Sequence, residues 1–490
     1  MTSLKLSLLT FLAVSSLLLH SSLQARTLPS HYQLLDVSDS IQRAISAVSK
    51  TDQQQQETTL SSSIIPDDGG LLNASSFSVP LYSREKIDRA DHKDYKSLLL
   101  SRLARDAARV RSLTSKLRRS VQLESHKGNH EFDVEDLSTP VVSGISQGSG
   151  EYFSQIGIGT PPKAAQLAID TGSDVTWVQC KPCTDCYEQA DPIYDPSASS
   201  TYQPLSCSAP ACTALIQPAC SAGTCQYRVS YGDGSFTTGD FVTETVALGS
   251  SGTVPNLAIG CGHDNEGLFR GSAGLLGLGG GAVSFPSQIK ARSFSYCLPD
   301  RDSSASSTLD FNSATPGGAV TTQLAKNARI HTFYYVALSG LSVGGKPVQI
   351  PPSVFQVDAS GRGGIIVDSG TAVTRLQSVA YTALRDAFRS MTSDLPSAPG
   401  VSLFDTCYDF SSITGGKVQV PTVALVFAGG KSLPLPAKNY LIPADSDGKF
   451  CFAFAGTRSP LSIIGNVQQQ GIRISYDLAN SLVGFSPSKC

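Results

Sequence analysis

The sequence predicts a mainly β protein built from two homologous lobes. From about Gly150 onward, short apolar runs are separated by Gly and Pro, and few segments show helical periodicity. The whole chain has 43 Gly, only 2 Met and a charged fraction of 16%, a composition typical of folds rich in strands and turns. One short motif also occurs twice in this region, which indicates a duplicated structural unit.

The first 25 residues have the pattern of a secretory signal peptide. Lys5 precedes a short apolar core from Leu6 to Leu19, and the segment ends at Ala25. An apolar run of about 14 residues is too short to span a bilayer, and no apolar tail closes the chain. We therefore expect a protein of the secretory pathway without a membrane anchor. A net charge of −2 gives no indication of nucleic-acid binding.

The next segment is polar and then basic. Residues 26–80 contain TDQQQQETTLSSS and few large apolar side chains, so we expect them to be unstructured, with a glycosylation sequon at Asn73. Residues 94–120 carry Leu and Ala at helical spacing, with eight basic and two acidic side chains. This stretch is either a solvated amphipathic helix or a detachable inhibitory segment that lies across an acidic cleft.

The β-rich region contains recognisable elements and all twelve cysteines. We expect a helix at 384–391 and strands in four segments: EYFSQIGIG, NLAIGCG, TFYYVALSGLSV and PTVALVFAGG. No cysteine precedes Cys180. An even number of cysteines after a signal peptide favours six disulfides over a metal site, and only two histidines share this region with them.

The repeated motif centres on an aspartate. IDTGSDVTWVQ at 169–179 aligns without gaps to VDSGTAVTRLQ at 367–377, so that Asp368 matches Asp170 at a distance of 198 residues. Each motif is followed about a hundred residues later by two apolar residues and a glycine, ending at Gly277 and Gly465. Two features repeated in the same order predict two lobes, related by an approximate two-fold axis, that bring both aspartates together.

Two facing carboxylates have a specific chemistry. Like charges in hydrogen-bond contact cannot both ionise, so the pair shares a proton, and one member acts as base while the other acts as acid. A water between them can then be deprotonated as it attacks an amide carbonyl. Gly172 and Gly370 allow the loops to approach closely. We expect Thr171 and Ser369 to reach the opposite loop and Ser173 and Thr371 to bond the carboxylates.

These motifs resemble those of the pepsin-like aspartic peptidases over about residues 149–490. The resemblance implies a bilobal double β-barrel with an active-site cleft between the lobes, and an endopeptidase active at acidic pH on polypeptide substrates. It implies Asp170 and Asp368 as the catalytic residues. It also implies a monomer without cofactor or metal. The same resemblance identifies YGDGS as the flap, with Tyr231, Gly232 and Asp233 over the substrate and Trp177 as partner of the tyrosine.

Within the family the chain is similar to the plant nepenthesin-like branch, whose cysteine-rich insert matches residues 180–225. HKDYKSLLLSRLARD, CGHDNEGLF, SLFDTCYDF and SIIGNVQQQG are similar to guard-cell aspartic proteases. The signal peptide predicts the secretory pathway, with the apoplast, the endoplasmic reticulum and the vacuole all open as the final location. Its pattern implies these disulfides: Cys180–Cys183, Cys186–Cys261, Cys207–Cys225, Cys212–Cys220, Cys297–Cys490 and Cys407–Cys451. The implied organisation is a signal peptide (1–25), a propeptide (26–140) and two catalytic lobes (149–325 and 326–490).

A different class of function stays open at this point. Some plant relatives of this fold are storage proteins or glycosidase inhibitors without working catalytic residues. A binding protein would tolerate loss of an aspartate, the flap tyrosine or a supporting hydroxyl, and all of these are present. A nucleophilic hydrolase is disfavoured because no GxSxG motif occurs. We expect Asp174, next to Ser173, to be an exposed turn carboxylate.

Overall fold

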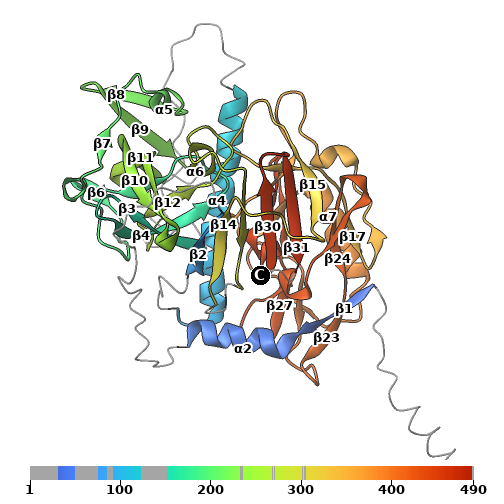
Figure 1. Ribbon diagram of the computed structural model, residues 1–490. Coiled ribbons are helices and arrows are strands. Elements are labelled where there is room, and N and C mark those ends of the chain that lie inside the picture. The colour runs from blue at the N-terminus through green and yellow to red at the C-terminus, as the bar shows by residue number, and fades with distance from the viewer. Residues whose placement is uncertain are drawn as a thin grey trace, which may run out of the picture.

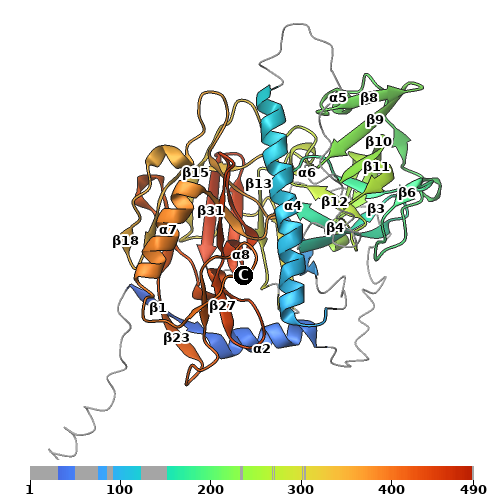
Figure 2. The same ribbon diagram turned by 180° about the vertical axis from the view of Figure 1, so that it is seen from behind.

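The structure is a computed structural model. It describes residues 31–49, 76–84, 92–122, 152–231, 235–267, 269, 271–300, 302, 305–487 and 490. Two β-rich lobes lie on either side of one long helix, α4 (Tyr95–Gln122), which is drawn in cyan between the green and the red halves of the chain (Figures 1 and 2). The mainly β, bilobal fold predicted from the sequence is confirmed. The predicted signal peptide and Asn73 lie outside the described residues.

The strands of both lobes form one hydrogen-bonded network that closes on itself. Its main members in the first lobe are β3 (Tyr152–Ile158), β4 (Lys163–Asp170), β5 (Trp177–Gln179), β9 (Thr224–Ser230), β10 (Phe236–Ala247), β11 (Thr253–Glu266) and β12 (Gly274–Gly277). Those that follow are β13 (Ser293–Cys297), β14 (Ser307–Phe311), β15 (Val320–Ala325), β16 (Tyr335–Val336), β19 (Ile365–Val367), β20 (Thr374–Gln377), β28 (Phe454–Thr457), β29 (Ser462–Ile464), β30 (Ile472–Asp477) and β31 (Leu482–Pro487).

The duplicated sequence motif is also duplicated in the structure. β4 ends at Asp170 and pairs in parallel with β12, so that Asp170 lies opposite Gly277. β19 ends one residue before Asp368 and pairs in parallel with β29, and the Asp368 amide donates to Ile464 O at 3.1 Å. Both strand ends are buried, so each aspartate enters the interface from the end of a rigid strand.

Predicted elements inside the lobes are mostly confirmed. EYFSQIGIG contains β3, and NLAIGCG lies within β11. TFYYVALSGLSV is divided between β16 and β17 (Leu338–Val343), and PTVALVFAGG contains β24 (Val423–Phe427). The helix predicted at 384–391 is longer, because α7 spans Ser378–Ser390. None of the helices in the described part of the chain combines the length and the apolarity needed to cross a membrane.

The expectation that residues 26–80 are unstructured is wrong for two described segments. β1 (Tyr32–Asp36) pairs antiparallel with β23 (Lys417–Pro421), and the helix α2 (Val37–Val48) follows directly. β2 (Phe77–Ser83) lies between β3 and β14 as an inner strand. β1 and one edge of β2 pair with strands more than two hundred residues away. Such partners cannot be predicted from the composition of the segment itself.

Four of the six expected disulfide pairings are wrong. The structure joins Cys180 to Cys261 and Cys183 to Cys186, with Cα–Cα distances of 5.3 and 6.1 Å. Cys180 follows β5, whose parallel pairing with β11 aligns Val178 with Cys261, and this register brings the two cysteines together. The expected pairs Cys180–Cys183 and Cys186–Cys261 are therefore not formed.

In the insert, each disulfide joins two cysteines of similar burial. Cys212 and Cys225 are both buried and form one bond, while the more exposed Cys207 and Cys220 form the other. The expected pairs Cys207–Cys225 and Cys212–Cys220 would each join a buried cysteine to a more exposed one. Cys297–Cys490 and Cys407–Cys451 are formed as expected.

Candidate active site

The carboxylates of Asp170 and Asp368 converge on a single guanidinium, that of Arg109 in α4. Arg109 Nη2 donates to Oδ1 of both aspartates, at 2.9 Å in the case of Asp368. Nη1 donates to Asp170 Oδ2 at 2.9 Å, and Nε donates to Asp368 Oδ2 at 3.2 Å. Since one nitrogen contacts an oxygen of each carboxylate, the two aspartates face a point that one small polar group can fill.

The two loops that carry the aspartates are cross-linked behind them by hydroxyls, as expected. The Ser369 amide donates to Thr171 Oγ1 at 3.0 Å, and the Thr171 amide donates to Ser369 Oγ at 3.3 Å. Each hydroxyl then donates to a carbonyl of the opposite strand, Thr171 to Val367 O at 3.4 Å and Ser369 to Ile169 O at 3.3 Å. This reciprocal pattern fixes the distance between the lobes at the site.

The hydrogen bonds to the carboxylates differ between the two motifs. Thr371 Oγ1 donates to Asp368 Oδ2 at 2.6 Å, as expected. The matching expectation for Ser173 is wrong, because its buried Oγ has no hydrogen-bond partner within the described residues. The Gly172 amide donates to Asp170 Oδ1 at 2.9 Å in its place. A backbone donor therefore serves one aspartate and a hydroxyl serves the other.

Gly172 and Gly370 are required by the closeness of the groups at this point. A Cβ on Gly172 would lie 2.9 Å from Asp368 Oδ1 and would also overlap Arg109. A Cβ on Gly370 would lie 3.0 Å from Arg109 Nε. A side chain at 172 would therefore occupy the space in which the two carboxylates meet, and one at 370 would crowd the guanidinium of Arg109.

An aromatic cluster adjoins the first aspartate loop. Trp177 Nε1 donates to Tyr231 OH at 3.2 Å, so the expected pairing of these two residues is present. Phe269 packs edge-on against both, with ring centroids 5.0 Å from Trp177 and 5.1 Å from Tyr231. Phe269 closes the CGHDNEGLF segment, but nothing in that segment marks it as a partner of Trp177 and Tyr231. Gly232 and Asp233 lie outside the described residues.

Helix α4 binds along the site by apolar contacts on both sides of Arg109. Leu99 and Leu103 pack against a cluster of the second lobe that includes Phe404, and Leu113 and Leu117 pack against another that includes Phe333. Lys116 Nζ lies 5.5 Å from the centre of the Phe333 ring and donates to Gly172 O at 3.3 Å. The helix is thus held by hydrophobic packing, with charged groups at its centre.

The charged groups of α4 respond differently to this burial. Burial alone would lower the pKa of the Arg109 guanidinium, but the carboxylates of Asp170 and Asp368 outweigh it and raise that pKa. Burial lowers the pKa of the Lys116 ammonium, and the nearby Asp174 and Asp170 offset this only in part. Arg109 is therefore stabilised in its charged form by the site, while the charge of Lys116 is disfavoured there.

The expectation that Asp174 is an exposed turn carboxylate is wrong. Asp174 is 8% exposed, accepts a hydrogen bond from the Gly281 amide at 2.9 Å and accepts another from Thr332 Oγ1 at 2.5 Å. Both donors lie more than a hundred residues further along the chain, in segments separate from the two aspartate motifs. Asp174 therefore holds distant loops together beside the site.

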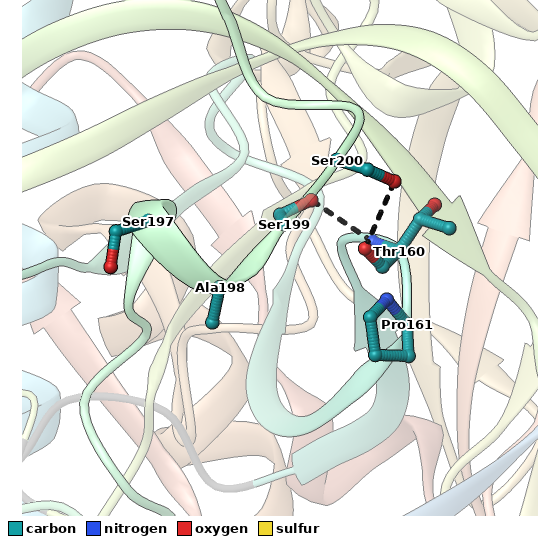
Figure 3. Close-up of a pocket in the computed structure, with 6 residues that line it drawn as sticks. All are labelled: Thr160, Pro161, Ser197, Ala198, Ser199 and Ser200. Atoms are coloured by element: carbon teal, nitrogen blue, oxygen red, sulfur yellow. Dashed lines mark hydrogen bonds between the residues drawn. The ribbon is translucent and has the colours of Figure 1, made fainter.

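Other candidate sites are weaker. A surface hollow of about 480 Å³ is lined by Thr160, Pro161 and residues 197–200. Its residues are drawn in Figure 3, and Ser199 Oγ accepts from the Thr160 amide at 3.0 Å. Its lining has hydroxyl groups but no carboxylate, imidazole, amine or thiol, so it offers no acid or base that could activate them. Among the described residues, no group of three or more His, Cys, Asp or Glu side chains could hold a metal ion.

Sequence comparisons find family models and relatives that match both lobes of the chain. Residues 152–312 match the family described as "Xylanase inhibitor N-terminal", and residues 333–487 match "Xylanase inhibitor C-terminal". "Aspartyl protease family protein 2" of Arabidopsis thaliana is 51% identical over 409 residues, 82% of this chain and 83% of that protein. "Protein ASPARTIC PROTEASE IN GUARD CELL 2" of the same plant is 44% identical over 85% of this chain and 88% of its own length.

"Aspartic proteinase nepenthesin-1" of Nepenthes gracilis is 43% identical over 71% of this chain and 80% of that protein. Solved structures support the fold. The structure titled "Crystal structure of edgp" has a TM-score of 0.59 at 21% identity, covering 69% of this chain and 91% of that one. Basic 7S globulin from soybean has a TM-score of 0.54 at 21% identity, covering 68% and 92%.

Proposed function

The chain belongs to the pepsin-like aspartic protease family of plants, and we propose that it is an endopeptidase that hydrolyses peptide bonds at acidic pH. The observation that carries this proposal is the contact of one nitrogen, Arg109 Nη2, with both Asp170 and Asp368. A water molecule at the position of that nitrogen would lie within hydrogen-bond distance of the same two carboxyl groups. It would donate to the ionised one and could accept from the protonated one.

The proposed reaction uses the two carboxylates in different protonation states. The ionised carboxylate takes a proton from the water as the water oxygen attacks the amide carbonyl carbon, and the protonated one donates to the carbonyl oxygen. The C–N bond of the tetrahedral intermediate then breaks as its nitrogen takes the proton that the first carboxylate received from the water, and a hydroxyl proton of the intermediate returns to the second carboxylate. Acidic pH is expected because one of the two carboxyl groups must be protonated, which the close approach of two like charges also favours.

We propose further that the full chain is a zymogen. Arg109 occupies the place assigned to the water, and the apolar side chains of α4 cover the surface on both sides of it. This supports the inhibitory interpretation of the basic helix, with residues 26–140 as the removable propeptide. A secretory route is supported by the six disulfides, which form in oxidising compartments.

A second candidate function, that of an inhibitor or binding protein, is favoured by the match of both lobes to families described as xylanase inhibitor domains. Against it stands the complete set of interacting groups: both aspartates, the cross-linking hydroxyls and the Trp177–Tyr231 pair. An inhibitor would have no need for two carboxylates held at the distance of one bridging atom.

One assay separates the two functions. The purified full chain is acidified and incubated with a denatured protein, with and without pepstatin, whose hydroxyl mimics the attacking water of the transition state. We expect fragments to appear at acidic pH and pepstatin to suppress them. Absence of cleavage, after α4 has been removed by an external protease, would favour the binding protein.

A further inference from the structure

One turn before Arg109, α4 carries an acidic side chain that is bound by the second lobe. Asp106 Oδ1 accepts hydrogen bonds from the backbone amides of Ala372 at 2.6 Å and Val373 at 3.1 Å. Its other oxygen accepts from the guanidinium of Arg375, with which it forms a salt bridge. The three donors belong to the loop and strand that directly follow Asp368.

The receiving site is built into the second lobe. Arg375 lies on β20, between β28 and β29, and is only 5% exposed. Its Nη1 donates to Val373 O at 3.2 Å, which orients the guanidinium toward the helix. Burial raises the pKa of the Asp106 carboxyl, against the opposing influence of Arg375 and the two amides. While α4 is bound, Arg375 is buried and its charge is balanced by Asp106, and the two amides complete a set of three donors that converge on one carboxylate.

We propose that Arg375, with the amides of Ala372 and Val373, forms a substrate subsite that binds an acidic side chain. The inference rests on the proposed function, in which α4 lies where the polypeptide substrate binds. When α4 leaves, the three donors face the cleft with the geometry that now holds a carboxylate. Arg375 is thus a specificity-determining residue: it contacts the substrate away from the cleaved bond.

The position of the acidic residue in the substrate follows from helix geometry. Asp106 precedes Arg109 by three residues, an axial distance of about 4.5 Å in an α-helix. An extended chain advances about 3.3 Å per residue. The acidic side chain therefore belongs within about three residues of the cleaved bond. Apolar neighbours are expected beside it, because Leu99 and Leu103 pack on an apolar cluster next to the same loop.

The test uses the activated enzyme and matched peptides that carry Asp or Asn at each of the three positions on either side of the cleaved bond. At about pH 5, above the ordinary aspartate pKa of about 3.9, the acidic peptides are ionised. We expect kcat/KM to be about 10- to 100-fold higher for Asp than for Asn at one position, the range of a hydrogen bond to a charged group.

Variants locate the effect. Arg375→Gln should bring the Asp/Asn ratio close to one, Arg375→Lys should keep part of it, and Arg375→Glu should favour a lysine peptide. Arg362→Gln, at an exposed arginine of the same lobe, should leave the ratio unchanged. Equal rates for Asp and Asn peptides at every position would overturn the subsite and leave the peptidase intact. If no peptide is cleaved at all, the proposed function is wrong and the subsite with it. The ratio measured in the unsubstituted enzyme decides the question even if a variant does not fold.

Discussion

At the scale of single residues, Asp170, Asp368 and Arg109 form a buried ion cluster in which each member depends on the others. The guanidinium stays charged throughout the acid range, because the carboxylates raise its pKa despite burial. The charge of Arg109 therefore persists in acid, and its attachment to the site depends on the two carboxylates that face it.

Removal of this cation should weaken the binding of the helix. Arg109→Gln in the full chain leaves the buried carboxylates without their partner, a loss of about 3–5 kcal/mol for an ion pair of this kind. We expect the activity of the variant to appear about 100-fold faster or more than that of the unsubstituted chain at the same mildly acidic pH, since each 1.4 kcal/mol is a factor of about ten. The measurement is the time course of peptide hydrolysis after dilution into buffers of different pH. Arg118→Gln, at an exposed position of the same helix, is the control; a pH profile of Arg109→Gln equal to that of the control would contradict the model.

At the scale of elements, α4 shows why a charged helix can bind tightly between two lobes. Its exposed positions include 104, 111 and 118, one line at seven-residue spacing, while most of the remaining surface is covered. Leucines on both sides of Arg109 supply the apolar contact, and the ions at the centre fix the register. Because each buried leucine stabilises the bound helix through packing, its truncation should weaken the binding of α4.

Two adjacent leucines provide a matched test of this packing. Leu99 is 0% exposed in the contact with the second lobe, while Leu100 is 41% exposed. Leu99→Ala should weaken binding of α4 by about 2–5 kcal/mol, as expected for a buried leucine, and so accelerate activation of the full chain. Leu100→Ala should change it little. The readout is the rate at which activity appears after acidification at one pH. If the two variants behave alike, the apolar contact does not hold the helix.

At the scale of the whole molecule, the two lobes contribute equivalent parts to one site. β4 and β19 deliver the aspartates, β12 and β29 lie beside them, and Thr171 and Ser369 lock the loops together. This symmetry is what the repeated sequence motif encodes, and for this reason the fold and the meeting of Asp170 with Asp368 could be predicted from sequence.

The features that could not be predicted from the sequence are those that depend on contacts in the folded structure. Arg109 is one of eight basic residues in its segment, and only the docked helix distinguishes it from Arg118. The strand at 32–36 and the burial of Asp174 depend on partners that are distant in sequence. The cysteine pairs of the insert depend on which sulfurs are buried together, a property that spacing does not contain.

The central claim is that both aspartates act on one water as a single unit. The most direct test compares kcat/KM for the unsubstituted enzyme, Asp170→Asn, Asp368→Asn and the double variant, all processed by the same external protease. We expect each single change to lower kcat/KM by about 10⁴-fold or more, with the double variant no worse than either single one, as for residues that function together. Substantial activity in either single variant, or losses that multiply in the double variant, would contradict the shared site.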